Sequence, residues 1–353
     1  MIQLLCLKDF KQYPGTMFDV RSPAEYAHAH IPGAQPLPLF TNEERAQVGT
    51  VYKQQGKDQA IALGLKLVGP KLADFVAQAQ QQAPTRCAKL YCWRGGMRSS
   101  AMAWLLNFAG ISSVLLEGGY KTYRHWCLAN LALPYRFVVL GGLTGSGKTA
   151  ILHALSTLGE QILDLEALAN HRGSAYGNLG NMQAQPSTEH FENAIAERLH
   201  ALDPQLPIWV EDESRLIGTC HIPSPLFAQM RGAPFVCINI PIEERLERLF
   251  VDYGQSSAQH LESATLRIAR HLGSQRTSRV FEALRSGLLI DAMRIVLQYY
   301  DATYLHTLAR KPSPLAIIDE AGIAPLDHAR KLQQLVSRSL INQCNNIHAK
   351  AAS

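Results

Sequence analysis

The sequence predicts an α/β protein of two domains, each a parallel sheet covered by helices, with a helical extension at the C-terminal end. Short apolar runs alternate with amphipathic segments through the first third of the chain, which is typical of βα units. The pattern stops at Pro134 and restarts with a new apolar strand. From about Glu243 the spacing becomes helical. The 353 residues have room for two or three domains of roughly 150 residues each.

The N-terminal domain is expected to occupy residues 1–130, with strands at residues 17–20, 89–92 and 113–119. Residues 58–82 have helical spacing that Gly69 and Pro70 interrupt, so two helices meeting at a turn are expected.

The second domain is expected to occupy residues 136–353, after a boundary between Trp126 and Arg136. Its strands are expected in continuous apolar runs, which are typical of parallel sheets buried on both faces. These runs are residues 137–140, 161–166, 207–212 and 234–240. A helical tail is expected from about residue 243 to the end.

The composition is that of an ordinary globular chain. Apolar residues make up 47% and charged residues 18%, and no run approaches the roughly 20 apolar residues of a membrane span. The N-terminus lacks the features of a secretory signal, so a cytoplasmic location without a membrane partner is expected. The seven cysteines show neither zinc-ligand spacing nor a disulfide framework. A net charge of +5 permits a polyanionic partner without requiring one.

The stretch GGLTGSGKT, residues 141–149, contains the complete pattern G-x-x-x-x-G-K-[ST] between an expected strand and an expected helix. Glycines in this context let backbone N–H groups turn toward phosphate oxygens, and the helix N-terminus adds partial positive charge. A chance glycine turn is the alternative. The expected phosphate-binding residues are Gly142, Gly145, Ser146, Gly147, Lys148 and Thr149.

A carboxylate at the end of a second apolar strand usually completes such a phosphate site. Residues 207–215, PIWVEDESR, offer Glu211, Asp212 and Glu213. Asp212 is chosen for the contact with a metal or water, and Thr149 would share Mg²⁺ with it if a metal is used. For Glu211 and Glu213 an exposed acidic turn is an equally good interpretation.

A second loop, YCWRGGMRSS at residues 91–100, follows the expected strand at residues 89–92. A helix N-terminus together with Arg94 and Arg98 should lower the pKa of the Cys92 thiol and favour the nucleophilic thiolate. Gly95 and Gly96 are expected to take positive φ and let N–H groups surround a tetrahedral anion. An inert buried cysteine is the alternative.

This loop, with residues 18–34 and 114–126, resembles a rhodanese domain. The shared features are a strand ending in Asp19 and Arg21, a turn containing His30, Pro32 and Gly33, and a glycine pair before an aromatic helix. These five residues are interpreted as structural. One departure matters: five residues separate Cys92 from Arg98 where rhodaneses commonly have four. The wider loop has the Cys-x5-Arg-[ST] pattern of cysteine phosphatases and should admit a phosphate-sized group.

A rhodanese-like domain followed by a P-loop domain resembles the tRNA 2-selenouridine synthases over nearly the whole chain. The resemblance also includes residues 49–68, 165–180, 185–193, 209–218 and 299–304. It implies an enzyme that replaces sulfur by selenium at C2 of wobble 2-thiouridine in the anticodon loop of tRNA. The sulfur is first alkylated from geranyl diphosphate, and the S-geranyl group is then displaced with selenium from selenophosphate.

The resemblance implies two phosphorylated co-substrates, no tightly bound cofactor and an optional Mg²⁺. Cys92 would accept selenium or assist its transfer, with Arg94, Arg98 and the loop N–H groups stabilising phosphate. The P-loop would bind geranyl diphosphate. An enzyme that supplies selenophosphate would be a further partner.

For the tRNA, residues 266–279 carry four arginines that can form a basic stripe on helices. These arginines are Arg267, Arg270, Arg276 and Arg279. An exposed helical face without RNA is an equally good interpretation. His171, Arg172 and Tyr176 lie in a glycine-rich stretch, where they would contact an extruded base. His30 and His190 are interpreted as packing residues.

Three other functions stay open. The Cys-x5-Arg-[ST] spacing favours a cysteine phosphatase, although Tyr91 stands where many such enzymes have histidine. An ATP-dependent tRNA sulfurtransferase or a kinase would use the P-loop for nucleotide hydrolysis. A non-enzymatic sulfur-carrier or tRNA-binding module would use both loops only to hold ligands.

Overall fold

The computed structural model describes residues 2–174, 176, 184–309 and 313–336. The chain divides into two compact units. The first unit contains Met1–Leu131 and Pro186–Glu197, and the second contains Ala132–Gln185 and Arg198–Ser353. Sequence reasoning placed residues 186–197 in the second domain, whereas the structure packs them with the first.

The first unit is built on a five-stranded sheet in which all neighbouring strands are parallel. The strands, in their order across the sheet, are β1 (Gln3–Leu5), β5 (Ser112–Leu116), β4 (Cys87–Tyr91), β2 (Thr16–Asp19) and β3 (Gln35–Pro36). Phe18, Leu90 and Leu115 of the strands pack with Met102 and Leu106 in one buried core. Because β4 is the central strand, it delivers Cys92 to the middle of the sheet's carboxyl edge.

Helices connect and cover these parallel strands. They are α1 (Leu7–Gln12), α2 (Pro23–His28), α3 (Asn42–Gln55), α4 (Lys57–Val68), the 3₁₀ helix η1 (Gly69–Lys71), α5 (Leu72–Gln82), α6 (Met97–Phe108) and α7 (Gly119–Leu131). The expected interruption at Gly69 and Pro70 is confirmed, because η1 separates α4 from α5.

Helix α10 (Thr188–His200) belongs to the first unit for most of its length. Its Asn193 amide donates to the His30 carbonyl at 3.0 Å, and Arg124 of α7 donates to the Asn193 side chain at 2.5 Å. Arg124 also pairs with Glu192 at 2.5 Å, and Lys11 pairs with Glu197 at 2.9 Å. These contacts join a helix from the middle of the sequence to the first unit.

The second unit is built on another five-stranded parallel sheet. Its strands, in order across the sheet, are β12 (Ala316–Asp319), β11 (Phe235–Asn239), β6 (Phe137–Gly142), β8 (Ile208–Glu211) and β7 (Gln161–Leu163). A short antiparallel hairpin pairs β9 (Leu216–Ile217) with β10 (Cys220–His221). The expected helical tail is wrong for one segment, because β12 pairs with β11 at the edge of the sheet.

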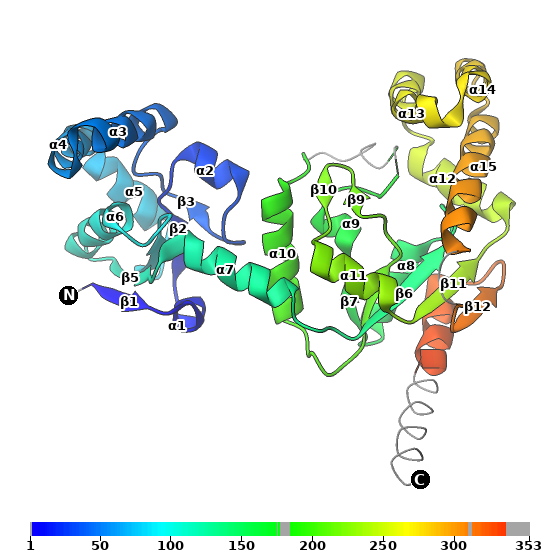
Figure 1. The fold of residues 1–353 in the computed structure, drawn as a ribbon, viewed down its shortest axis with the longest axis horizontal. Coiled ribbons are helices and arrows are strands. Elements are labelled where there is room, and N and C mark those ends of the chain that lie inside the picture. The colour runs from blue at the N-terminus through cyan, green and yellow to red at the C-terminus, as the bar shows by residue number, and fades with distance from the viewer. Residues whose placement is uncertain (1, 175, 177–183, 310–312, 337–353) are drawn as a thin grey trace, which may run out of the picture. The chain divides into compact units, whose positions relative to one another are not determined.

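The helices of the second unit form two groups with separate cores. The first group is α8 (Lys148–Thr157), α9 (Leu165–Leu168), α11 (Ser224–Gly232) and the helical residues 325–336. The second group is α12 (Ile242–Tyr253), α13 (Ala258–Leu272), α14 (Ser274–Arg285) and α15 (Leu289–Leu308). Figure 1 shows the second group clustered beside the sheet. Leu246, Leu261, Val280 and Val296 belong to its own apolar core.

In the part of the chain that the structure describes, no helix combines the length and the apolar character needed to cross a membrane. The α/β fold class with two parallel sheets and a helical C-terminal extension is confirmed.

Candidate active site

Cys92 lies directly after β4, and its side chain is surrounded by the start of α6. The residue is 3% exposed. Its Sγ accepts a hydrogen bond from the Gly96 N–H at 3.3 Å. It also lies 3.3 Å from the Ser99 hydroxyl, which can donate either to the sulfur or to the Gly96 carbonyl at 3.1 Å. Hydrogen bonds to an ionised acceptor are stronger than those to a neutral one. The two donors are therefore placed to stabilise negative charge on this sulfur.

The backbone of residues 116–120 packs closely against the thiol loop. Gly119 has φ +61°, and a Cβ there would lie 2.3 Å from the Cys92 carbonyl oxygen. The Tyr120 N–H donates to that oxygen at 2.9 Å. Gly95 has φ +64°, and a Cβ there would lie 2.7 Å from the Leu116 carbonyl oxygen. Only glycine fits at both positions without moving the backbone.

Gly96 departs from the expected geometry. Its φ is −99°, not positive, because it is the N-cap residue of α6 and takes the extended conformation common at that position. Its N–H donates to the sulfur of Cys92 at 3.3 Å.

The two loop arginines have different surroundings. Arg94 is exposed. The side chain of Arg98 is 22% exposed and its Nη1 donates to Glu25 of α2 at 2.8 Å. Burial alone would raise the pKa of Glu25, but the hydrogen bond and charge of Arg98 hold this pKa below its ordinary value. Arg98 is thus fixed at the loop by a carboxylate that stays ionised.

Of the residues interpreted as structural, Asp19 and Arg21 are buried and His30 is half-buried. Arg21 donates to Asp19 at 2.5 Å and to the Ala29 carbonyl at 2.6 Å. Its guanidinium carbon lies 3.9 Å from the centroid of the Tyr120 ring. The His30 ring stacks on Tyr26, with centroids 3.9 Å apart. All these groups are occupied by contacts with one another, which supports their structural interpretation.

His190 of α10 packs against His30, with ring centroids 4.2 Å apart. Burial, with the neighbouring His30 ring, lowers the pKa of His190 to about 4. A ring that stays neutral and packed is consistent with a structural role.

The P-loop connects β6 to α8 in the second unit. Gly145 and Gly147 have φ of +81° and +79°, so this path requires glycine. Gly142 also has positive φ, and a Cβ there would lie 2.7 Å from the Ile238 carbonyl oxygen. The Lys148 ammonium donates back to the Gly142 carbonyl at 3.1 Å, and the Ser146 hydroxyl donates to the Leu143 carbonyl at 2.6 Å.

Two arginines of α12 contact this loop, and sequence reasoning missed both. Arg248 donates to the Ser146 carbonyl at 2.7 Å, and its Nη1 lies 2.9 Å from where a Cβ on Gly147 would be. Arg245 donates to the Thr144 carbonyl at 3.0 Å and pairs with Asp301 of α15 at 2.7 Å. The two arginines lie about a hundred residues beyond the loop in sequence, so only the spacing of Arg245 and Arg248 on one helix face hinted at a shared role.

Three carboxylates gather beside the P-loop, and Asp212 is not among them. Glu166, Glu211 and Glu213 offer oxygen atoms that all lie within 4.8 Å of one another. Thr149 Oγ1 donates to Glu166 at 3.4 Å. Asp212 instead accepts a hydrogen bond from the Tyr304 hydroxyl at 2.9 Å. The geometry therefore favours this glutamate cluster beside Thr149 as the metal-side group, while the choice of Asp212 stays a prediction.

The electrostatics of the glutamate cluster favour a bound cation. Burial raises the pKa of Glu166 to about 9 and that of Glu213 to about 8, and the charge of Glu211 adds to both shifts. Burial also raises the pKa of Glu211, whose Oε1 is buried without a hydrogen-bond partner. Hard oxygen ligands suit Mg²⁺. The three carboxylates and the Thr149 hydroxyl therefore fit a divalent cation beside the P-loop.

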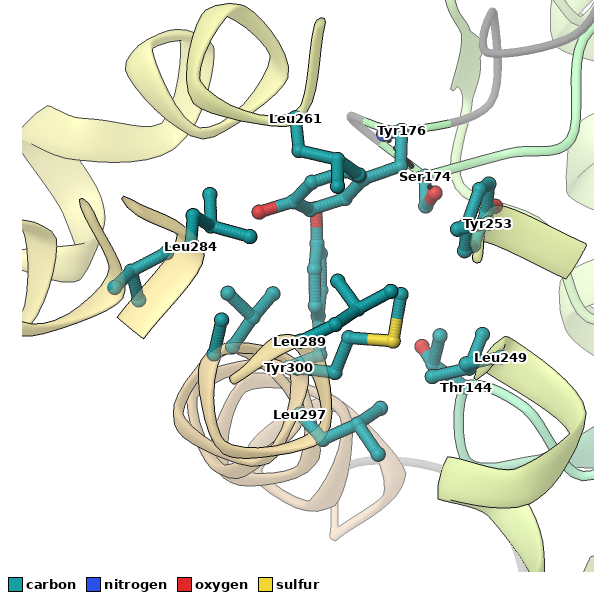
Figure 2. A pocket seen from close by; sticks show the side chains of 14 residues that line it. Thr144, Ser174, Tyr176, Leu249, Tyr253, Leu261, Leu284, Leu289, Leu297 and Tyr300 are labelled. Carbon is teal, nitrogen blue, oxygen red and sulfur yellow. Dashed lines mark hydrogen bonds between the residues drawn. The ribbon is translucent and has the colours of Figure 1, made fainter. Parts of the chain in front are cut away.

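An apolar pocket opens next to the P-loop (Figure 2). Thr144 of the loop, Leu249 and Tyr253 of α12, and Ser174 and Tyr176 line part of it, and side chains of α13, α14 and α15 line the rest. The apolar lining residues are Leu261, Val280, Leu284, Leu289, Ala292, Met293, Val296 and Leu297. A ligand with a phosphorylated head on the P-loop would have an apolar cavity beside that head.

The residues expected to contact tRNA fall into two classes. Arg267, Arg270, Arg276 and Arg279 are all exposed on α13 and α14. Arg172 is exposed and pairs with Asp252 at 3.3 Å.

The other two residues expected at tRNA are enclosed, which does not fit direct stacking on a base. His171 is 5% exposed, and Tyr176 lines the apolar pocket, where its hydroxyl lies 2.7 Å from Thr265 Oγ1. Sequence reasoning read this stretch as polar and missed the apolar pocket that α13–α15 supply to Tyr176. Residue 175 and residues 177–183 of the same stretch lie outside the described residues.

The fold and the two sites define a protein that joins a rhodanese-type thiol loop to a P-loop phosphate site. Residues 5–125 match the model of the rhodanese-like domain, and residues 135–321 match that of the tRNA 2-selenouridine synthase AAA domain. The chain belongs to the tRNA 2-selenouridine synthase family.

Relatives named tRNA 2-selenouridine synthase match the chain over most of its length. Those from Aeromonas salmonicida and Pseudomonas putida are 36% and 34% identical, over 84% and 86% of this chain and 88% and 91% of their own. The relative from Bdellovibrio bacteriovorus is 35% identical over 86% of this chain and 92% of its own.

Proposed function

We propose that the protein replaces sulfur with selenium at C2 of wobble 2-thiouridine in tRNA, in two steps at two sites. Geranyl diphosphate alkylates the sulfur at the P-loop unit, and selenophosphate supplies selenium at the Cys92 loop. Family membership supports selenium modification of tRNA. The observation that carries the alkylation step is the apolar pocket that begins at Thr144 of the P-loop.

The pocket and the P-loop together have the two chemical characters of geranyl diphosphate. N–H groups of a P-loop, with Lys148 and Arg248, suit a diphosphate head. The hydrocarbon tail would lie between Leu289 and Leu297 (Figure 2), in a cavity of about 30 Å³ whose side chains would have to move apart to admit it. Burying such a tail contributes roughly 25 cal/mol for each Å² of apolar surface. A nucleoside triphosphate has no comparable apolar part.

In the alkylation step, the sulfur at C2 attacks C1 of the geranyl group, and the carbon–oxygen bond to diphosphate breaks. Lys148 and Arg248 neutralise the charge that develops on the departing diphosphate. The carboxylates of Glu166, Glu211 and Glu213 would hold Mg²⁺, which would act as a Lewis acid on the same group. In the second step selenium enters at C2 and the geranyl thiol leaves.

A substitution that fills the pocket tests the alkylation site. In Ala292→Phe the added ring occupies the space of the tail, so we expect geranyl transfer to fall at least about ten-fold, the cost of a misfitted apolar group. Binding of inorganic pyrophosphate, measured by calorimetry, should stay unchanged. Met293→Phe makes a similar change with less added volume, and Leu266→Phe on the exposed side of α13 is the matched control.

The outcome distinguishes the proposal from its alternatives. If both pocket variants lose pyrophosphate binding and geranyl transfer equally, the pocket does not hold the geranyl tail. ATP hydrolysis stimulated by tRNA, with no alkylated nucleoside formed, would favour an ATP-dependent sulfurtransferase instead.

A further inference from the structure

We propose that Cys92 attacks the phosphorus of selenophosphate, so that the loop releases selenide for the tRNA and briefly carries a phosphoryl group on its sulfur. The inference rests on the proposed function, because it names the chemistry by which the selenation site uses its reagent. It gives Cys92 a nucleophilic role at phosphorus rather than a role as a selenium carrier.

Attack at phosphorus and attack at selenium differ in whether the oxidation states of sulfur, selenium and phosphorus change. A thiolate that attacked selenium would form an S–Se bond and expel phosphite, which oxidises sulfur and selenium and needs a reductant later. Attack at phosphorus forms an S–P bond and breaks the Se–P bond, and selenium leaves with the bonding electron pair as selenide. No oxidation state of sulfur, selenium or phosphorus changes, so no further reagent is required.

The remaining steps also balance. Selenide attacks C2 of the S-geranylated uridine, and the C–S bond breaks to release geranyl thiol. Water then attacks phosphorus on the Cys92 sulfur, the S–P bond breaks, and inorganic phosphate leaves. The thiol of Cys92 is regenerated for the next turnover.

The width and direction of the loop suit a phosphoryl group. Five residues separate Cys92 from Arg98, and the loop ends at α6, a helix of 12 residues. The N–H groups in the first turn of a helix have no acceptor within the helix. Gly96, the N-cap residue of α6, donates its N–H to the sulfur, so Sγ lies at the N-terminal end of this helix. Such donors can hold the equatorial oxygens of a transferring phosphoryl group.

Arg98 is held by an ion pair with Glu25 and keeps donors that a phosphate could use. Glu25 accepts from Nη1 at 2.8 Å and from Nη2 at 3.5 Å. The Ser22 N–H in turn donates to Glu25 at 3.0 Å. A guanidinium has five N–H donors, so this pair leaves several for phosphate oxygens. Glu25 is thus a positioning residue, which orients Arg98 without touching the reagent.

Ser99 has a distinct part in the second half of the reaction. When water attacks phosphorus, the sulfur of Cys92 is the leaving group and gains negative charge. The Ser99 hydroxyl, 3.3 Å from Sγ, is placed to donate to that charge. Losing a hydrogen bond to a charged leaving group changes a rate by about ten-fold or more. Removing it should therefore slow hydrolysis about ten-fold or more and let the phosphorylated cysteine accumulate.

The test uses the full chain and selenophosphate labelled with radioactive phosphorus, without tRNA. After a rapid acid quench we expect label on the peptide that contains Cys92, at up to one phosphate per chain, with selenide released and captured by an alkylating agent. Cys92→Ser should carry no label. Cys6→Ser, which removes an exposed cysteine, should behave like the natural chain. Ser99→Ala should increase the labelled fraction.

Selenium on Cys92 without phosphorus would overturn the proposal, as would equal labelling of Cys92→Ser and the natural chain. A parallel sample receives S-geranylated tRNA and is read for 2-selenouridine. A natural chain that makes this nucleoside while never carrying phosphate on Cys92 defeats the inference alone. A chain that carries the phosphate and never makes the nucleoside defeats the proposed function.

Discussion

Glu211 and Glu213 join the carboxylate cluster, whereas Asp212 between them accepts from the Tyr304 hydroxyl, which in turn accepts the Gly142 N–H of the P-loop. Glu211 ends β8 and pairs with Leu140 of β6, the strand that leads into the P-loop. A shift of one residue reverses the face of every side chain. The sequence predicted a functional carboxylate among residues 211–213. It does not show which of three consecutive acidic residues joins the site. Packing of β8 against its neighbours decides it.

The three glutamates of the cluster, of which Glu211 is buried and the other two are half-buried, predict how stability depends on pH. Their pKa values in the folded chain lie above the ordinary 4.5. The pKa is about 9 for Glu166 and about 8 for Glu213. The folded state therefore keeps protons that the unfolded chain loses, and the free energy of unfolding should fall as the pH rises from about 4.5 toward about 8–9. Urea unfolding in EDTA across this range measures the fall, and Glu213→Gln should make it shallower. A flat profile in the natural chain would contradict the assignment.

A divalent cation should restore that stability. If the cluster holds Mg²⁺, an excess of about one hundred times the dissociation constant adds about 2.7 kcal/mol to the free energy of unfolding. Glu211→Gln should lose this increment, because it replaces the carboxylate whose Oε1 has no hydrogen-bond partner. Asp212→Asn is the matched control and should keep it. The readout is the denaturation midpoint with and without MgCl₂. Equal stabilisation of both variants would place the cation elsewhere.

At the scale of elements, α15 links the apolar pocket to the P-loop. One end of the helix supplies Met293 and Leu297 to the pocket lining. Further along, the Tyr304 hydroxyl accepts the Gly142 N–H at 2.9 Å. Asp301 pairs with Arg245, which donates to the Thr144 carbonyl. The helix that contacts the tail therefore also positions the phosphate loop.

Tyr304→Phe should loosen the P-loop while leaving the pocket intact. The Gly142 N–H loses its acceptor, and an unsatisfied buried N–H costs about 1–3 kcal/mol. We expect the KM for geranyl diphosphate to rise about five-fold or more, with kcat changed less. Tyr299→Phe, on the same helix, is the control. If both variants bind pyrophosphate as the natural chain does, Tyr304 has no positioning role.

The sequence predicted the elements that carry both loops, because each is a continuous apolar strand followed by glycines and a helix. It did not predict β12, whose four residues AIID are too short to separate from helix by periodicity. Pairing with β11 decides that segment. Tyr176 was expected at an exposed base, but α13–α15 enclose it in an apolar pocket, and such long-range packing has no local signal.

At the scale of the whole molecule, α10 shows that the first unit is not one continuous stretch of chain. The first unit also includes residues 186–197, which lie between the two sequence segments of the second unit. Asn193 is fully buried there, between the Tyr120 hydroxyl and the His30 carbonyl. A boundary near residue 131 is visible in the sequence, whereas this insertion is not, since α10 has the pattern of an ordinary amphipathic helix.

A fragment of residues 1–131 should accordingly be less stable than the same residues joined to α10. It exposes the apolar and polar groups that α10 covers, so we expect thermal unfolding several degrees lower than for a chain in which residues 184–200 are attached through a flexible linker. Circular dichroism on the two proteins measures the difference. Asn193→Ala in the linked protein should remove part of the gain. Identical unfolding temperatures for fragment and linked protein would show that α10 contributes nothing.

The central claim is that the two anion loops serve two reagents in successive steps on one nucleoside. The most direct measurement is the mass of nucleosides after digestion of 2-thiouridine tRNA treated with geranyl diphosphate and selenophosphate, separately and then together. The natural chain should form the S-geranyl nucleoside with the first reagent and convert it to 2-selenouridine with the second. Cys92→Ser should stop after the geranyl nucleoside, and Lys148→Ala should stop before it. Loss of selenation but not of geranylation in Lys148→Ala would reverse the assignment of the loops, and unchanged thiouridine in every sample would contradict the account.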